Sequence, residues 1–151
     1  MAGLIYDVPV TGVSLTGGTA QTLIMVTAPT NQALKILEIV CSLNGATSTN
    51  APATLDYGRP STSGTSSSGT AFKRDPGRGE TVQATLGITF TVEPTWTSVL
   101  ASEVYVPQFN GLYHWMIPFT SPIIVSGGGR FAIRVNSPNN VSASARITVE
   151  E

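Results

Sequence analysis

Hydrophobic and polar residues alternate along much of this chain, most regularly over residues 33–43, ALKILEIVCSL. Alternate side chains of a β-strand point to opposite faces of its sheet. One face of this stretch carries Leu37, Ile39, Cys41 and Leu43, and the other carries Glu38, Val40 and Ser42. The pair Asn44-Gly45 then gives a strong turn signal. The pattern predicts a long, half-buried strand that forms the spine of a β-sandwich.

Similar alternation predicts shorter strands on both sides of this spine. We expect them at residues 19–27, 53–59, 71–74, 82–92, 103–106, 112–117, 123–125, 131–136 and 144–150. Short turns suggest two hairpins, one from 19–27 with 33–43 and one from 131–136 with 144–150. No segment keeps the apolar repeat of 3.6 residues that a helix needs.

About eight to nine antiparallel strands with closely spaced turns predict an all-β sandwich. A jelly-roll sandwich is favoured over an immunoglobulin-like one, because the well-patterned strands at both ends of the chain are suited to pair within one sheet. The length of 151 residues fits one domain, which needs no disulfide or metal for its core. The single cysteine, Cys41, reads as a small buried hydrophobic residue.

Residues 1–18 are weakly patterned: Leu4, Ile5 and Tyr6 are apolar, and Pro9 and Gly12 interrupt the segment. A first strand, a disordered tail and an extended arm that grips a neighbouring subunit all fit this pattern. We take residues 1–18 as an N-terminal arm and residues 19–151 as the sandwich domain. On that hypothesis, deleting residues 2–10 leaves a folded protein.

Two connecting segments stand out by composition. Residues 61–70 contain only Ser, Thr and Gly, which is typical of a flexible, solvated connector. Residues 73–80 are rich in charge and contain Gly77 and Gly79. They lack the Lys-Ser/Thr pair of a phosphate-binding loop, so a charged contact loop is the better interpretation.

The residues that enzymes need are sparse. The only histidine is His114, the nine acidic residues are dispersed, and no G-x-S-x-G motif occurs. We therefore expect no catalytic residues, metal or cofactor. The net charge of -1 favours neither nucleic acid nor a membrane surface as a partner. The N-terminus does not resemble a secretory signal, and no apolar run is as long as a membrane span.

Two groups of residues are candidates for a partner or subunit interface. The first is aromatic and consists of Trp96, Phe109, Tyr113 and Trp115. These rings fit either a sugar-stacking platform or a packed interface. The second group, Glu38, Arg134 and Arg146, lies on the polar faces of predicted strands and would form a cross-strand charge ladder if those strands are neighbours.

The order of these features resembles a known family. A short arm, the LKILEI strand, the Ser/Thr/Gly loop, the Asp75-Pro76 turn, the step at residues 93–95 and the GGGRFAIRV strand before a last hairpin are similar to the small jelly-roll head-decoration (cement) proteins of tailed bacteriophages. The resemblance covers residues 19–151 and rests on pattern and order.

This resemblance implies a non-enzymatic virion structural protein, made in the host cytoplasm and located on the outer surface of the phage capsid. Its expected partners are two further copies in a homotrimer, the major capsid protein of the phage head and, through Leu4, Ile5 and Tyr6 of the arm, neighbouring trimers. A jelly-roll carbohydrate- or receptor-binding module of a phage tail or baseplate is the alternative.

Overall fold

The computed structural model describes residues 3–45, 51–107 and 111–151, with only the backbone for residues 98 and 100–104. Within these ranges the regular structure is entirely β, and no helix there is long and apolar enough to cross a membrane. The strands are β1 (Ile5–Leu15), β2 (Ala20–Thr27), β3 (Leu34–Asn44), β4 (Ala53–Pro60), β5 (Thr65–Ser68), β6 (Phe72–Lys73), β7 (Thr85–Val92), β8 (Trp96–Val106), β9 (Leu112–Met116), β10 (Ile123–Val125), β11 (Arg130–Asn136) and β12 (Val141–Glu150).

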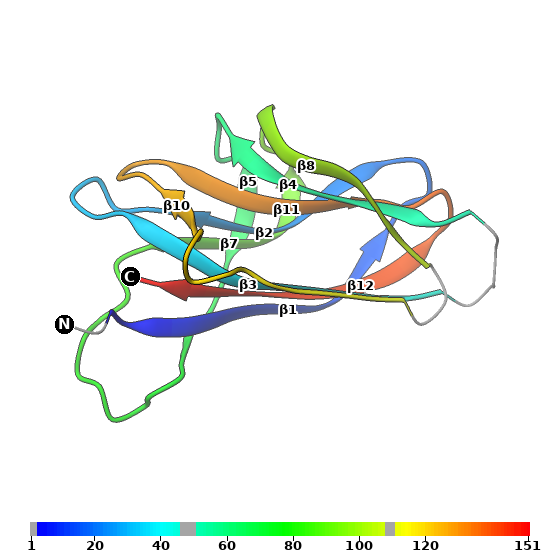
Figure 1. The fold of residues 1–151 in the computed structure, drawn as a ribbon. Coiled ribbons are helices and arrows are strands. Elements are labelled where there is room, and N and C mark those ends of the chain that lie inside the picture. Colours follow the sequence, from blue (N-terminus) through cyan, green and yellow to red (C-terminus); the bar gives the residue numbers. More distant parts are fainter. Residues whose placement is uncertain (1–2, 46–50, 108–110) are drawn as a thin grey trace.

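These strands form two antiparallel sheets that lie face to face as a sandwich (Figure 1). Sheet A has the order β10-β3-β12-β1-β6, with β9 also paired to β3. Sheet B has the order β5-β7-β2-β11-β4-β8. The predicted all-β sandwich is therefore confirmed.

The pairings in the two sheets are nested along the chain. β1 pairs with β12, β2 with β11, β3 with both β9 and β10, and β4 with β8. The chain thus runs like one long hairpin bent across two sheets, with β5 to β7 inserted near its tip. The two ends of the chain pair within one sheet, but they do so through β1, whereas the predicted first strand at residues 19–27 lies in the other sheet as β2. They also lie side by side at one end of the sandwich (Figure 1), where Leu4 and Glu151 exchange backbone hydrogen bonds of 2.8 and 2.9 Å.

The core fills the space between the apolar faces of the two sheets. Its largest fully buried side chains are Tyr6, Phe131, Leu23, Ile24, Leu34, Ile36, Ile39, Leu55, Ile133, Ile147 and Val8. The spine strand β3 buries Ile39, Cys41 and Leu43 as its alternation predicts. A bulge against β12, between Ile36 and Glu38, changes the alternation before that point, so Ile36 is buried in place of Leu37.

The predicted N-terminal arm is wrong for residues 5–15, which form β1 inside sheet A. β1 lies between β12 and β6, and Tyr6, Val8 and Val10 are buried in the core. Pro9 does not prevent this pairing, because the even-numbered residues of this part of β1 bond to β12, as Leu4 does to Glu151, and the nitrogen of Pro9 therefore points away from β12. Gly12, with a φ of 66°, and a bulge after Val10 accommodate the irregular segment that follows. The sandwich therefore includes β1, and the predicted boundary at residue 18 does not separate an arm from a domain.

The two predicted hairpins are also wrong. β2 lies in sheet B and β3 in sheet A, and β11 and β12 are divided between the sheets in the same way. Each of these strands has one strongly apolar face. Crossing from one sheet to the other lets those faces meet across the core, whereas a hairpin would place them side by side.

The Ser/Thr/Gly segment contains a strand rather than only a flexible connector. Residues 65–68 form β5 on the edge of sheet B, paired with β7. Backbone hydrogen bonds hold this strand without apolar side chains, and the N–H of Gly69 adds a 2.9 Å bond to the carbonyl of Leu86. Composition alone does not reveal such a strand, since its stability comes from the neighbouring β7.

Gly64, just before β5, allows a direct test of whether β5 is held in place by its pairing with β7. Its φ is 61°, and a Cβ atom would clash with the carbonyl oxygen of Val92. We expect Gly64→Ala to detach β5 from β7 at a cost of about 1 kcal/mol, because an L-residue is strained in this conformation. Hydrogen exchange at residues 65–69 should accelerate, while Gly79→Ala, which has open space around its Cβ, leaves it unchanged. Unchanged exchange in Gly64→Ala would mean that β5 is not held in this way.

Candidate functional site: a charge network on the outer face of sheet A

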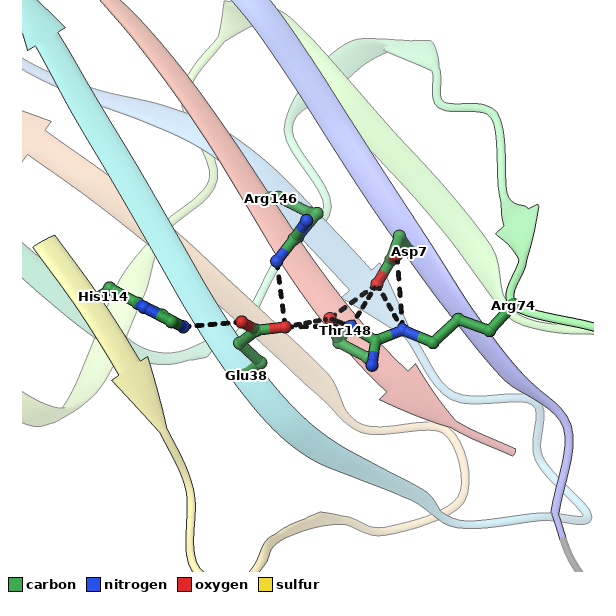
Figure 2. Close-up of polar contacts among 6 residues, drawn as sticks. All are labelled: Asp7, Glu38, Arg74, His114, Arg146 and Thr148. Atoms are coloured by element: carbon green, nitrogen blue, oxygen red, sulfur yellow. Dashed lines mark hydrogen bonds and ion pairs between the residues drawn. The ribbon is translucent and has the colours of Figure 1, made fainter. Parts of the chain in front are cut away.

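Six polar side chains meet on the outer face of sheet A and form what we call the outer-face network (Figure 2): Asp7, Glu38, Arg74, His114, Arg146 and Thr148. Strand register places the centre of this network. Asp7 of β1 is opposite Thr148 of β12, and Thr148 is opposite Glu38 of β3. Directly opposed residues have their side chains on the same face, so these three form a row across three strands.

The Thr148 hydroxyl connects the two carboxylates of this row. It lies 2.6 Å from Oδ1 of Asp7 and 3.0 Å from Oε2 of Glu38. A hydroxyl has one hydrogen, so it donates to one of the two acceptors at a time. Thr148 is 1% exposed, and its hydroxyl is therefore fixed beneath the charged side chains.

Arg74 approaches the row from the end of β6, where its backbone N–H donates to the carbonyl of Ile5 at 3.0 Å. Its Nη2 is 3.2 Å from Oδ1 of Asp7, 2.9 Å from Oε2 of Glu38 and 3.1 Å from Oγ1 of Thr148. One guanidinium thus bridges both carboxylates, which would otherwise repel each other.

Two more basic side chains reach Glu38 from neighbouring strands. Arg146 of β12 and His114 of β9 both lie opposite Val40 of β3, on either side of it. Nη2 of Arg146 is 3.0 Å from Oε2 of Glu38, and Nε2 of His114 is 2.6 Å from Oε1. Nε of Arg146 is buried without a hydrogen-bond partner among the described residues.

Glu38 is the centre of the network, and its side chain is only 13% exposed. Burial is the largest single influence on its pKa and raises it. The contacts with His114, Thr148, Arg146 and Arg74 together outweigh burial and hold the pKa of Glu38 below its usual value. Hydrogen bonding to Asp7 likewise raises the pKa of Arg74. The network is therefore a fixed array of charges and hydrogen bonds.

A shallow groove and exposed apolar side chains border this array. The groove has a volume of about 260 Å³ and runs over β1, β12 and β3, with Pro9, Val40, Ser42 and Arg146 among its lining residues. On β9, Leu112 and Met116 are 66% and 69% exposed. They flank His114 on the same face of the strand. The outer face of sheet A thus combines ordered charge with apolar surface.

The structure brings together two members of the predicted charge ladder. Glu38 and Arg146 are in contact, as described above. Arg134 lies on β11 in sheet B, where its Nε is 2.8 Å from Oδ2 of Asp56 and its guanidinium is 4.5 Å from the centre of the Trp96 ring. The ladder fails at Arg134 because β11 and β12 belong to different sheets.

The predicted aromatic residues do not form one platform. Trp96 packs against Met25, Phe90 and Ala132 on sheet B. Tyr113 and Trp115 pack against the core from β9, with the ring centroids of Trp115 and Tyr57 5.3 Å apart. Phe109 lies outside the described residues.

The apolar residues assigned to the arm are also largely internal. Leu4 and Tyr6 are buried, and the Tyr6 hydroxyl donates to Oε2 of Glu151 at 3.2 Å. Ile5 points to the outer face and is half-buried. The side chains of Leu4 and Tyr6 are thus not available to a neighbouring subunit.

Sequence reasoning missed four members of the network. Asp7 was assigned to an arm and Arg74 to a contact loop, His114 was considered only as the single histidine of the chain, and Thr148 was one polar residue among many. The signal that points to Thr148 and Arg146 is their position on the polar face of β12, the same face as the acidic side of β3. Asp7 becomes recognisable only when residues 5–15 are read as a strand.

Comparison of this chain with protein-family models, with curated proteins and with solved structures gave no match. Among the described residues, no group of three or more His, Cys, Asp or Glu side chains is arranged to hold a metal ion. The outer-face network is therefore interpreted from its own geometry.

Proposed function

We propose that this chain is a non-enzymatic virion structural protein that binds the outer surface of a phage capsid as a homotrimer and stabilises the shell. In this proposal the major capsid protein is the partner, and the outer face of sheet A faces the capsid. The sequence resemblance described above is the reason for choosing a capsid as the partner.

The outer-face network is the observation that favours a binding surface over a catalytic one. A general base or nucleophile needs a carboxylate oxygen that is open to a substrate. Both oxygens of Glu38 are instead engaged, one by His114 and the other by Thr148, Arg74 and Arg146. Such a charge array presents a constant pattern to a partner, which gives specificity and register in protein binding.

The strand order supports the fold that the family resemblance implies. The nested pairings of β1 with β12, β2 with β11, β3 with β9 and β10, and β4 with β8 agree with a jelly roll that has β5 to β7 as an insertion. In such a sandwich the core is closed between the sheets, and the outer faces are free for contacts with other proteins.

The proposed mechanism is stabilisation by mass action. A protein that binds the assembled shell but not the separated capsid subunits shifts the equilibrium towards the shell. The apolar groove along Val40 supplies buried area in this contact, and the basic side chains at its edge fix the orientation. No chemical step is required.

Counting copies in purified particles tests the proposal most directly. Quantitative mass spectrometry of virus particles from the source should give this chain in a ratio near one to one with the major capsid protein. A handful of copies per particle would indicate a location in the tail and favour receptor binding. Absence from the particle would contradict the proposal.

Filling the groove tests which face meets the capsid. Ser42 is half-buried in the groove and makes no contact in the network, so Ser42→Arg adds bulk and charge without removing an interaction described here. We expect it to weaken binding to purified shells at least about tenfold, or roughly 1.4 kcal/mol. Thr27→Arg, on the outer face of sheet B, is the matched control and should bind normally. Equal occupancy of both variants would exclude the outer face of sheet A as the capsid contact.

A further inference from the structure

β9 forms an open edge of sheet A. It pairs with β3 on one side, and the described residues give it no partner on the other side. The carbonyl of Gly111 accepts from the N–H of Leu43 at 2.8 Å, and the N–H of Ile117 donates to the carbonyl of Leu37 at 2.9 Å. Odd-numbered residues of this segment therefore bond to β3. Backbone groups alternate in direction along a strand, so those of Leu112, His114 and Met116 point away from the sheet.

Other parts of the sheet A edges are protected against pairing with another chain. At β10, Nη2 of Arg59 donates to the carbonyl of Ile124 at 2.8 Å. On the far edge, β6 covers the start of β1, and Pro9 and the bulge after Val10 interrupt the rest. Proline, bulges and charged residues are the usual means of blocking an exposed edge. The β9 sequence, LYHWM, has no proline, and its pairing with β3 has no bulge. Its only residue that can carry a charge is the central His114.

The β9 sequence is also self-complementary. Apolar Leu112 and Met116 lie at its ends, aromatic Tyr113 and Trp115 lie inside them, and His114 is at the centre. In antiparallel pairing about a two-fold axis at His114, Leu112 would face the partner's Met116, and Tyr113 would face the partner's Trp115. Apolar and aromatic cross-strand pairs of this kind are favourable.

We propose that β9 is a self-association strand, which joins two copies of this chain by antiparallel pairing centred on His114. In this register, the residues whose backbone groups point outwards lie opposite one another and exchange hydrogen bonds. Leu112 and Met116, exposed in the single chain, become partly covered. Sheet A then continues from one copy into the other.

Charge does not oppose this arrangement. The two His114 side chains lie opposite each other, and each has its own Glu38 carboxylate at 2.6 Å. In each copy the carboxylates of Asp7 and Glu38 balance the guanidiniums of Arg74 and Arg146, so these four side chains bring no net charge to the contact. A five-residue edge is a small contact, so we expect weak, concentration-dependent association of the free protein.

This inference does not rest on the capsid proposal, because it concerns the isolated protein in solution. A two-fold contact through β9 is also distinct from the three-fold contacts of a trimer. If both exist, β9 links one trimer to the next, which is the role that the sequence assigned to an N-terminal arm.

Cysteine cross-linking tests the register. Opposed residues in a hydrogen-bonded antiparallel pair have Cα atoms about 5.5 Å apart, within disulfide range. We therefore expect His114→Cys to form a disulfide-linked dimer under mild oxidation. Met116→Cys is the matched control, because its Cα atoms would be about 14 Å apart across the same axis. The natural Cys41 is fully buried and should not contribute.

Equal cross-linking of the two cysteine variants, or none in either, would overturn the proposal. A second test avoids cysteine chemistry. The double variant Leu112→Lys, Met116→Lys places like charges at both ends of the paired strands, and sedimentation velocity should then show loss of the concentration-dependent dimer. Phe72→Lys, at an apolar residue on β6 that is 58% exposed, should keep it. Dimers that persist in the lysine double variant would also exclude β9 as the strand through which two copies associate.

Discussion

Deleting residues 2–10 is expected to prevent this protein from folding. The deletion removes the first half of β1, and with it four buried side chains: Leu4, Tyr6, Val8 and Val10. It also removes the pairing partners of residues 145–150 in β12. β12 is the central strand of sheet A, so the loss exposes the apolar core and an unpaired edge at the same time. Circular dichroism and thermal unfolding should show no cooperative transition.

A single substitution tests the contribution of β1 to stability with a smaller change to the core. Tyr6 is fully buried, and its hydroxyl donates to Glu151. We expect Tyr6→Ala to lower the free energy of unfolding by about 3–5 kcal/mol, as for other large aromatic residues in cores. Ile5→Ala is the matched control on the same strand, because its side chain is half-buried on the outer face. Denaturant unfolding should show a much smaller effect for Ile5→Ala.

A cooperatively folded protein after deletion of residues 2–10 would contradict the position of β1. That result would restore the arm hypothesis, in which this segment serves only to hold a neighbouring subunit. Similar destabilisation by Tyr6→Ala and Ile5→Ala would contradict the burial of Tyr6 in particular. The deletion thus separates the strand interpretation of residues 1–18 from the arm and the disordered tail, which the sequence also left open.

The sequence predicted the fold class well because strand alternation is a local signal. β3 and β2 lie within a residue or two of their predicted bounds, since each has a continuous apolar face. β1 was harder to recognise because Pro9 and Gly12 break the pattern and a bulge absorbs the irregularity. β5 was missed because its residues bury little and depend on β7 for pairing.

Much less of the site was predictable, because sheet membership is a long-range property. Glu38 and Arg146 were correctly expected on polar strand faces, and their strands are neighbours. Arg134 has the same local pattern as Arg146, yet its strand lies in the other sheet. Arg74 reaches the network from a turn that pairs through only two residues of β6, and no periodicity in the sequence marks that position.

Replacing Glu38 by glutamine should also lower the stability of the fold, through the loss of charge at the centre of the outer-face network. The carboxylate accepts from His114, Thr148, Arg74 and Arg146, and an uncharged amide cannot satisfy all four in the same way. Hydrogen bonds to a charged group contribute about 1.5–3 kcal/mol when partly buried, and the cations here are half-exposed. We therefore expect Glu38→Gln to lower the free energy of unfolding by about 2 kcal/mol at pH 7.

The effect should depend on pH in a defined direction. Because folding lowers the pKa of Glu38, its ionised form stabilises the folded state at every pH above the unfolded-state pKa of about 4.3. That contribution falls as the pH drops below this value and through the folded-state pKa. The difference in stability between wild type and Glu38→Gln should therefore be full at pH 7 and shrink below about pH 4.

Glu80→Gln is the matched control for this experiment. Glu80 also pairs with an arginine, Arg78, but its side chain is 53% exposed, and a surface ion pair of this kind contributes little to stability. Urea unfolding of both variants between pH 3 and pH 7 makes the comparison. If the two variants behave alike, or if the Glu38→Gln difference grows as the pH falls, Glu38 is not the centre of a stabilising network. The outer face of sheet A would then lack the fixed charge array on which the proposed binding surface depends.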